Sequence, residues 1–538
     1  MVDSRKREYI LPVRIFKTLG SVKNADKLLK EKVPQIDITE PCVTEICALS
    51  GVVLDFGLEY HGGIKILTYA TGEDVCPVRI RFGESVVEVF SEIGEKGATN
   101  DHSLRDFHTQ LLNFSMTEVG QTGFRFVRID NLSNKSVFIK SVLGIYVHSG
   151  LELTGSFECG DDLINRIFET AKRTIYLNMQ EYLWDGIKRD RLVWMGDIYP
   201  EMLAIVALFG KNEILEKSLD FACNQSPLPR WINNIPMYSM WWIITCYDYF
   251  NHTGDLEFLK TNKNYLEELL DCIDKSIDEN GEMNYDPYFL DWPTRYTDDA
   301  VTGTRILNTV ALQDAIKILN YINADISVAE KCLNKLQQKK IPFSQAKQII
   351  GLKHWLGLQL DPTEKELLIK DGASGISTFM SYFILNAISE TAGIETANSI
   401  MKEYYGGMLN MGATSFWEDF DISWLKDNPS PIDRLPKDGQ KSIHADFGQH
   451  CYTGLRHSLC HGWSSGVIYY IFKRILGVKI LAPGCRKIEL NPNLSSMSFA
   501  KGNFPTPYGI ITIKCKQENG KLKVVCNAPK EVEIICSM

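Results

Sequence analysis

Acidic side chains, arginines and tryptophans are concentrated in one short segment, Trp184–Asp197. It contains three aspartates, three basic residues and two tryptophans. A carboxylate beside an arginine has a lowered pKa, whereas a carboxyl against an indole can have a raised one. That contrast separates a proton-donating acid from carboxylates that bind substrate. The segment is therefore a candidate catalytic loop, and the alternative is a structural loop rich in salt bridges.

A second cluster of acidic and aromatic residues, Gly412–Asp421, contains Glu418 directly after Trp417. A glycosidase needs two carboxyl groups across the scissile bond, one to donate a proton and one to activate water or attack. Glu418 is the natural partner for an acid in the first segment. Taken alone, Glu418 could equally cap a helix or lie on the surface.

All ten tryptophans lie between Trp184 and Trp463. Aromatic faces over a cleft suit a sugar-binding site, because the C–H faces of a pyranose stack on them. Core packing is the alternative, since a large helical core can absorb several indoles. The distribution leaves open whether four or more of them line a site.

Composition narrows the choice of partner. The 538 residues include 58 basic and 67 acidic side chains, a net charge of −9, which disfavours nucleic acid and is compatible with a neutral sugar. The N-terminus lacks an apolar stretch after its basic residues, and no run of about 18 apolar residues could cross a bilayer, so we expect a cytoplasmic protein without membrane contact. The 14 cysteines form no C-x-x-C pair and are expected to be free, mostly buried thiols.

The hydrophobic pattern divides the chain into three parts. Residues 1–154 are expected to form an N-terminal β-sandwich, with the first 45 or so residues hard to assign; Val78, Ile80 and Phe82, for example, alternate with arginines. We expect about a dozen helices in residues 155–477, the first of them capped by Asp161. Residues 478–538 should form a small β-domain, because Asn519-Gly520 is a strong hairpin signal.

The strands predicted in the first part include 64–69, 86–90, 124–129 and 137–147. The helices predicted in the second part include 163–175, 200–209, 265–277, 305–319, 328–338, 344–356, 377–388, 394–404 and 463–476. The strands predicted in the third part are 511–515, 522–526 and 532–536.

The two acidic and aromatic segments resemble motifs of a known family, the bacterial α-L-rhamnosidases of glycoside hydrolase family 78. The family pattern is an Asp, an acid five positions later in an R-acid-R-L run, and then W-x-G-D; Asp185, Asp190 and Trp194–Asp197 occupy these positions. Its G-A-T-T-x-W-E motif resembles Gly412–Glu418, and its S-L-N-H-x-x-x-G motif resembles Ser458–Gly466. The closing stretch resembles Pro483-Gly484, then Ala500–Gly502, then Pro507–Gly509. The likeness extends over residues 155–538.

The resemblance implies a fold, a reaction and a set of roles. The fold would be multidomain: an (α/α)6 barrel between the N-terminal β-sandwich and a small C-terminal β-sandwich domain. The reaction would be inverting hydrolysis that releases a terminal sugar, α-L-rhamnose or a relative, with Asp190 as general acid and Glu418 as general base. The residues expected to bind substrate are Asp185, Arg189, Trp194, Asp197, Trp241, Trp242, Asp291, Trp292, Trp417 and His461.

Two positions depart from the family pattern. The usual general acid is Glu, and the matching Asp190 is one methylene shorter, so its backbone would have to lie about 1.5 Å closer to the substrate, or the substrate class differs. The family's D-C-P start is Asp185-Gly186-Ile187 here.

The sequence is also compatible with functions other than that of a rhamnosidase. They are another inverting enzyme on the same barrel, a phosphorylase for which Glu418 would be dispensable, and a catalytically silent carbohydrate-binding protein. No nucleotide-binding motif indicates a cofactor. His450, Cys451, His457, Cys460 and His461 fall within twelve residues, but their spacing matches no standard zinc pattern, so no metal is predicted. The oligomeric state is not predicted.

Overall fold

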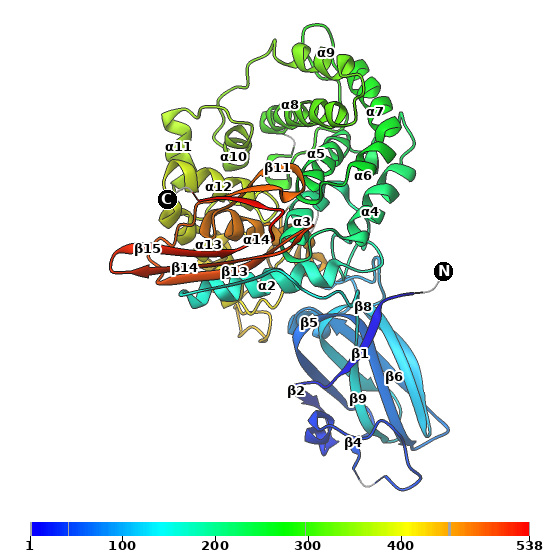
Figure 1. The fold of residues 1–538 in the computed structure, drawn as a ribbon. Coiled ribbons are helices and arrows are strands. Elements are labelled where there is room, and N and C mark those ends of the chain that lie inside the picture. Colours follow the sequence, from blue (N-terminus) through cyan, green and yellow to red (C-terminus); the bar gives the residue numbers. More distant parts are fainter. Residues whose placement is uncertain (1–2, 41, 296, 450–452, 537–538) are drawn as a thin grey trace.

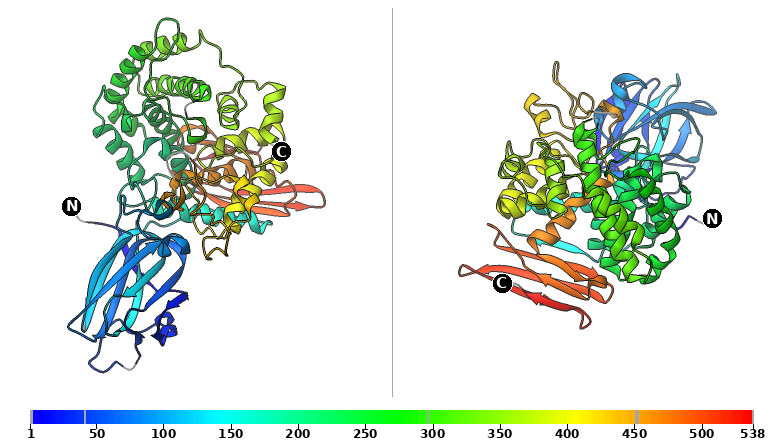
Figure 2. Two further views of the ribbon diagram at one scale, coloured as in Figure 1. Left: turned by 180° about the vertical axis from the view of Figure 1, so that it is seen from behind. Right: turned by 90° about the horizontal axis from the view of Figure 1, so that it is seen from above.

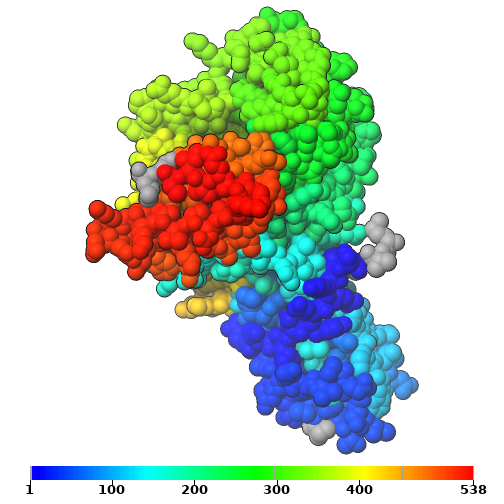
Figure 3. Space-filling model, in the orientation of Figure 1, coloured from blue at the N-terminus to red at the C-terminus, as the bar shows by residue number. Residues whose placement is uncertain are grey.

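The computed structural model describes residues 3–40, 42–295, 297–449 and 453–536. His450 and Cys451, two members of the histidine and cysteine group, lie outside these ranges. An N-terminal β-domain forms one lobe, and the helices and C-terminal strands form another (Figures 1 and 3). None of the described helices combines the length and the apolar character that a membrane crossing needs. The cysteines within the described ranges are free thiols, most of them buried.

The N-terminal domain is built from nine described strands that hydrogen bonds join into one sheet, in the order β3-β4-β9-β5-β8-β6-β7 with β1 on β9 and β2 on β5. The strands are β1 (Lys6–Ile10), β2 (Arg14–Leu19), β3 (Val22–Lys23), β4 (Thr44–Ile46), β5 (Gly51–Thr71), β6 (Val75–Gly83), β7 (Asp106–Leu112), β8 (Ser115–Asn131) and β9 (Val137–His148). The strand-rich domain that we expected is present. Its strands are not divided into two hydrogen-bonded sheets, because the long strands β5 and β8 continue through the shifts in register between them.

One predicted strand is wrong. Val86–Phe90 is the short helix α1 rather than a strand. The side chain of Ser85 accepts a hydrogen bond from the backbone N–H of Glu88, which is an N-cap. The apolar residues that suggested a strand are buried on this helix instead: Val86 and Val89 pack against Val53 and Phe126 of the sheet, and Val87 packs against Leu455.

Thirteen further helices are described: α2 (Asp162–Asn178), α3 (Met195–Leu208), α4 (Glu213–Asn224), α5 (Pro236–Thr253), α6 (Leu256–Thr261), α7 (Lys263–Ser276), α8 (Asp298–Tyr321), α9 (Ser327–Leu336), α10 (Lys347–Trp355), α11 (Pro362–Ile369), α12 (Ser381–Thr391), α13 (Ile394–Asn410) and α14 (Val467–Tyr470). Asp161 caps α2 as predicted, by accepting the N–H groups of Leu163 and Ile164. Six helices contact one another in a closed cycle, α3 to α5, α8, α10, α12, α14 and back to α3. The other seven of these helices are not members of this cycle. Figure 2 shows the helical lobe from behind and from above.

The C-terminal strands form two sheets beside the helices (Figure 1). The sheets are β10-β13-β14-β15 and β11-β12-β16, formed by β10 (Ser156–Cys159), β11 (Val478–Ala482), β12 (Lys487–Leu490), β13 (Phe499–Thr506), β14 (Gly509–Glu518), β15 (Lys521–Asn527) and β16 (Glu533–Cys536). Asn519 and Gly520 form the predicted turn, with φ of 53° and 74°. Strand β10 precedes the helices in sequence yet pairs with β13. The domain limits at 154 and 477 remain predictions.

The apolar cores show which parts depend on one another. Helices and C-terminal strands share one large core, which includes Phe157, Phe472 and Phe504. The N-terminal sheet has a separate core of its own. The C-terminal strands are therefore attached to the helices by a shared apolar core. The N-terminal domain is attached mainly by hydrogen bonds, ion pairs and small apolar clusters.

Gly477, at the joint between the helices and β11, provides a stability prediction. Its φ is +70°, and a Cβ there would lie 2.1 Å from the carbonyl carbon of Asn491. Gly357 also has a positive φ, +84°, but a Cβ there would meet nothing within 4 Å. We expect Gly357→Ala to cost about 1–2 kcal/mol from backbone strain alone and Gly477→Ala at least twice that, measured by denaturant unfolding. Equal losses in the two variants would contradict the collision at Gly477.

Candidate active site

The loop between α2 and α3 carries the first predicted motif and has a strained backbone. Asp190 and Arg191 have φ of 52° and 55°, a left-handed conformation that non-glycine residues seldom adopt. The carboxylate of Asp185 holds the far end of the loop, because its Oδ1 accepts the N–H of Leu192 at 2.9 Å. Strain of this kind costs about 1–3 kcal/mol per residue and persists where the surroundings impose it, often at functional sites.

Backbone hydrogen bonds join this loop to the two later motifs. The N–H of Gly462 donates to the carbonyl of Asp185 at 2.7 Å. The N–H of His461 donates to Phe416 at 2.9 Å, and the N–H of Glu418 donates to Ser458 at 3.0 Å. Three segments far apart in the sequence therefore form one unit, as expected if the motifs belong to one site.

Arg189 joins the two candidate catalytic carboxyls directly. Its Nη1 is 2.8 Å from Asp190 Oδ1, and its Nη2 is 2.5 Å from Glu418 Oε2. The indole N–H of Trp194 also donates to Asp190, at 3.1 Å from Oδ2. One planar guanidinium therefore links the two carboxyls and restricts how they lie relative to one another.

The electrostatics divide the acids of the site into two kinds. Burial acts to raise the pKa of Glu418, but Arg189, together with His461 and His457, outweighs it and lowers that pKa to about 2. Burial, assisted by the negative charge of neighbouring aspartates, raises the pKa of Asp185 well above its ordinary value. Burial also raises the pKa of Asp197, although His461 opposes the rise. Glu418 is thus ionised, which is the state that a base needs, whereas burial shifts the pKa values of Asp185 and Asp197 upwards.

A pocket of about 190 Å³ lies over these groups. Seven of the predicted site residues line it: Asp185, Asp190, Trp194, Asp197, Trp292, Glu418 and His461. His461 Nε2 is 3.0 Å from Asp197 Oδ1, so the imidazole and this carboxyl orient one another at the wall. Trp463 is the third tryptophan of the lining, so three of the ten line this pocket.

Two of the predicted binding residues, Trp241 and Trp242, belong to the core instead. Trp241 is fully buried and stacks on Tyr199 and Trp355, with ring centroids 4.9 and 5.9 Å away. Trp242 packs edge-on against Tyr265. Both lie on α5, whose residues are apolar on nearly all sides, so the helix is enclosed and its indoles have no open face for a sugar.

Three more predicted binding residues act from behind the pocket lining. Arg189 reaches the site through the two carboxyls. Asp291 accepts the backbone N–H of Trp292 at 2.8 Å and the hydroxyl of Ser377, and burial raises its pKa to about 6 against these two hydrogen bonds. Trp417 is buried against Phe420 and His457. Asp291 thereby orients Trp292 rather than contacting a ligand itself.

The remaining lining residues were not predicted: Ile235, Tyr238, Pro287, Phe289, Arg295 and Trp463. Trp463 lies within the Ser458–Gly466 motif and could have been found there. Tyr238 faces Asp197, with its hydroxyl 3.5 Å from Oδ2, but it lies on the largely apolar α5, where no pattern distinguishes it.

Two segments of the chain match models of known domain families. Residues 152–331 match the family model of the bacterial alpha-L-rhamnosidase 6 hairpin glycosidase domain, and residues 477–537 match that of the bacterial alpha-L-rhamnosidase C-terminal domain. Both models belong to bacterial α-L-rhamnosidases, which confirms the resemblance drawn from the motifs.

Individual relatives agree. An alpha-L-rhamnosidase of Alteromonas sp. is 23% identical over 94% of this chain and 57% of its own length, and one of Formosa agariphila is 22% identical over 76% and 46%. The chain spans about half the length of these curated relatives. The fold is similar to the GH78 rhamnosidase of Bacillus sp. GL1 (TM-score 0.74, 21% identity, 95% of this chain and 55% of that one). It is also similar to a Klebsiella oxytoca rhamnosidase with rhamnose bound (TM-score 0.65, 17% identity, 87% and 96%).

The contrast between core and pocket tryptophans is testable by substitution. We expect Trp241→Ala to destabilise the fold by about 3–5 kcal/mol, because it removes a buried indole from a stack. Trp292 is partly exposed at the pocket, so the Trp292→Ala substitution should reduce the free energy of unfolding by less than about half as much. It should, however, weaken the binding of sugars. Denaturant unfolding and sugar titrations monitored by tryptophan fluorescence measure the two effects. A Trp241→Ala protein of unchanged stability would show that Trp241 is not a core residue.

Proposed function

We propose that the chain is an inverting glycoside hydrolase that releases terminal α-L-rhamnose, or a related sugar, from small glycosides or oligosaccharides. The observation that carries the proposal is the pair of carboxyls, Asp190 and Glu418, bound to one guanidinium at the wall of the pocket. The similarity to rhamnosidases supports the sugar, and the closed cycle of six helices supports the (α/α)6 barrel.

In this mechanism the two carboxyls have different duties. Glu418, ionised because Arg189 and the two histidines lower its pKa to about 2, removes a proton from water on one face of the sugar. Asp190 protonates the glycosidic oxygen on the other face. The guanidinium of Arg189 then stabilises the negative charge that Asp190 acquires, because the two groups are already in contact. Inversion corresponds to carboxyls about 6.5–9.5 Å apart, far enough for a water molecule to lie between one of them and the sugar.

The other polar residues of the pocket are suited to hydroxyl groups. Asp197 and His461 form a pair that can both donate and accept hydrogen bonds. Trp292 and Trp463 present aromatic rings to the same space. We therefore assign sugar binding to these residues and to Asp185. The proposed substrate is a neutral glycoside, and the proposed reaction uses no cofactor.

Turnover of a panel of chromogenic glycosides tests the reaction. We expect cleavage of an α-L-rhamnoside with release of the inverted anomer, observed by proton NMR, and a loss of about 10²–10⁴-fold in kcat for Asp190→Asn and Glu418→Gln. Asp314→Asn is the control, since Asp314 is an equally buried acid outside the pocket. Retention of the anomer would overturn the inverting mechanism. Turnover that needs phosphate and survives Glu418→Gln would indicate a phosphorylase, and binding without turnover would indicate a carbohydrate-binding protein.

Replacing the shared arginine should change the pH dependence. In Arg189→Met the burial of Glu418 loses its largest opposing contribution, although His461 and His457 remain, so its pKa rises. Since a base works only when deprotonated, the acidic limb of the kcat/KM profile should move to higher pH, by about 1–3 units. Arg305→Met, at a buried arginine outside the pocket, should leave the limb in place. A limb unmoved by Arg189→Met would show that Arg189 does not set the ionisation of the base.

A further inference from the structure

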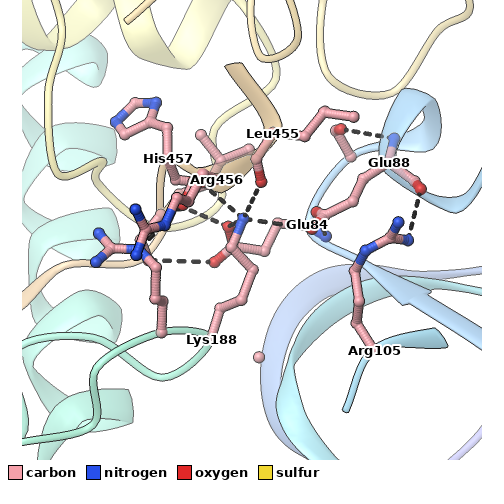
Figure 4. Close-up of polar contacts among 12 residues, drawn as sticks. Glu84, Glu88, Arg105, Lys188, Leu455, Arg456 and His457 are labelled. Carbon is pink, nitrogen blue, oxygen red and sulfur yellow. Dashed lines mark hydrogen bonds and ion pairs between the residues drawn. The ribbon is translucent and has the colours of Figure 1, made fainter. Parts of the chain in front are cut away.

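A buried cluster of charges lies where the N-terminal domain meets the candidate catalytic loop (Figure 4). At its centre is Lys188, two residues before Asp190. Its Nζ is 2.9 Å from Glu84 Oε2 and 3.4 Å from Glu88 Oε1, and both glutamates belong to the N-terminal domain. The three side chains are nearly inaccessible to solvent, at 8%, 0% and 1% exposure. Such a pair is costly to leave unmatched, because removing one partner strands a buried charge.

Lys188 also binds the segment that carries the third motif. Its Nζ donates to the carbonyl oxygens of Leu455 at 3.1 Å and His457 at 2.6 Å (Figure 4). One ammonium group therefore joins the catalytic loop, the segment before Ser458 and the N-terminal domain.

Glu84 reaches the base through a second route. Its Oε2 accepts the N–H of Leu459 at 2.7 Å, and its Oε1 is 3.5 Å from the hydroxyl of Ser458. The N–H of Ser458 donates in turn to Glu418 Oε2 at 3.2 Å. The carboxylate of Glu84 thus fixes two consecutive residues, one of which contacts the carboxylate of Glu418.

Other residues of the N-terminal domain hold the strained turn. The hydroxyl of Ser103 donates to the carbonyl of Lys188 at 2.8 Å, and Arg191 donates to the carbonyls of Gln121, at 3.0 Å, and His102. The imidazole of His102 lies 3.4 Å from Asp190. The left-handed conformation at Asp190 is therefore imposed in part from outside the helical domain.

A metal ion is a competing explanation for part of this cluster. Glu84, Glu88 and His444 have ligand atoms within 4.8 Å of one another. The positive charge between the glutamates is, however, already supplied by Lys188, and the nitrogens of His444 bind the hydroxyl of Ser85 and the carbonyl of His457. The cluster therefore needs no cation beyond the lysine.

We propose that Glu84 is a positioning residue for the catalytic pair: through Lys188 and the Ser458-Leu459 backbone, it fixes Asp190 and Glu418 relative to one another. The N-terminal domain is then part of the active site rather than an appendage. This inference rests on the proposed function for its catalytic consequence, but its structural content can be measured without turnover.

The test compares Glu84→Gln with a matched control, Glu364→Gln. Glu364 is 1% exposed, pairs with the buried Lys353 and accepts two backbone N–H groups, yet it lies on α11 away from the pocket. Hydrogen exchange is measured on peptides that cover residues 185–194 and 455–463. We expect at least a tenfold faster exchange there in Glu84→Gln and unchanged exchange in Glu364→Gln. Exchange equal to that of the wild type in Glu84→Gln would overturn the proposal, whether or not the protein is an enzyme.

Kinetics supply the second measurement. With a substrate that the wild type cleaves, kcat of Glu84→Gln should fall about 10–100-fold while KM changes less than threefold, because misplaced catalytic groups affect chemistry more than binding. Absence of wild-type turnover would contradict the proposed function and leave the exchange result to decide on Glu84. If Glu84→Gln does not fold, the double variant Glu84→Gln/Lys188→Met removes this ion pair as a unit, a change that buried pairs often tolerate, and leaves Glu88 as the remaining acid of the cluster. A folded double variant with wild-type kcat would refute the proposal, and one with the same loss in kcat would support it.

Discussion

The contact of one guanidinium with two carboxyls is the constraint around which the site is organised. Arg189 lies in a loop with little regular structure, yet it must meet Glu418, which is 229 residues further along the chain. A planar group with fixed donor directions tolerates little error in either partner. Three features keep this contact in place. They are the backbone hydrogen bonds between the three motifs, the left-handed turn at Asp190, and the ion pairs of Lys188 with Glu84 and Glu88.

Apolar burial explains much of the architecture but not this precision. The helices and C-terminal strands share one core, so their arrangement follows from covering hydrophobic surface. The N-terminal sheet buries its own core separately and meets the rest through small apolar clusters, hydrogen bonds and ion pairs. Hydrogen bonds and ion pairs are directional, so they can position a carboxyl accurately. They are concentrated beside the pocket, where the N-terminal domain meets the catalytic loop.

The sequence predicts those features that have a local signature. Asp161 before a periodic apolar run predicts α2, and Asn519-Gly520 predicts the last hairpin, because capping and turn chemistry depend on neighbouring residues. The motifs predict seven lining residues because the family pattern marks them. Helix α5 has no such signature, because an enclosed helix is apolar on all sides and lacks amphipathic periodicity. Without that periodicity, the sequence does not distinguish the enclosed Trp241 and Trp242 from tryptophans that line a pocket. Glu84 could not be predicted at all, since it meets Lys188 from 104 positions away.

The separate core of the N-terminal domain has a consequence for how this chain can change over evolutionary time. A lobe with its own core can in principle be exchanged or lost as a unit, as accessory domains often are. Here the boundary between the two lobes, called the seam below, contains Lys188 from the helical lobe and Glu84 and Glu88 from the N-terminal domain. All three side chains are shielded from water. A substitution on either side is tolerated only with a compensating one across the seam. The two lobes should therefore be inherited together, with the residues at their boundary covarying more tightly than those within either core.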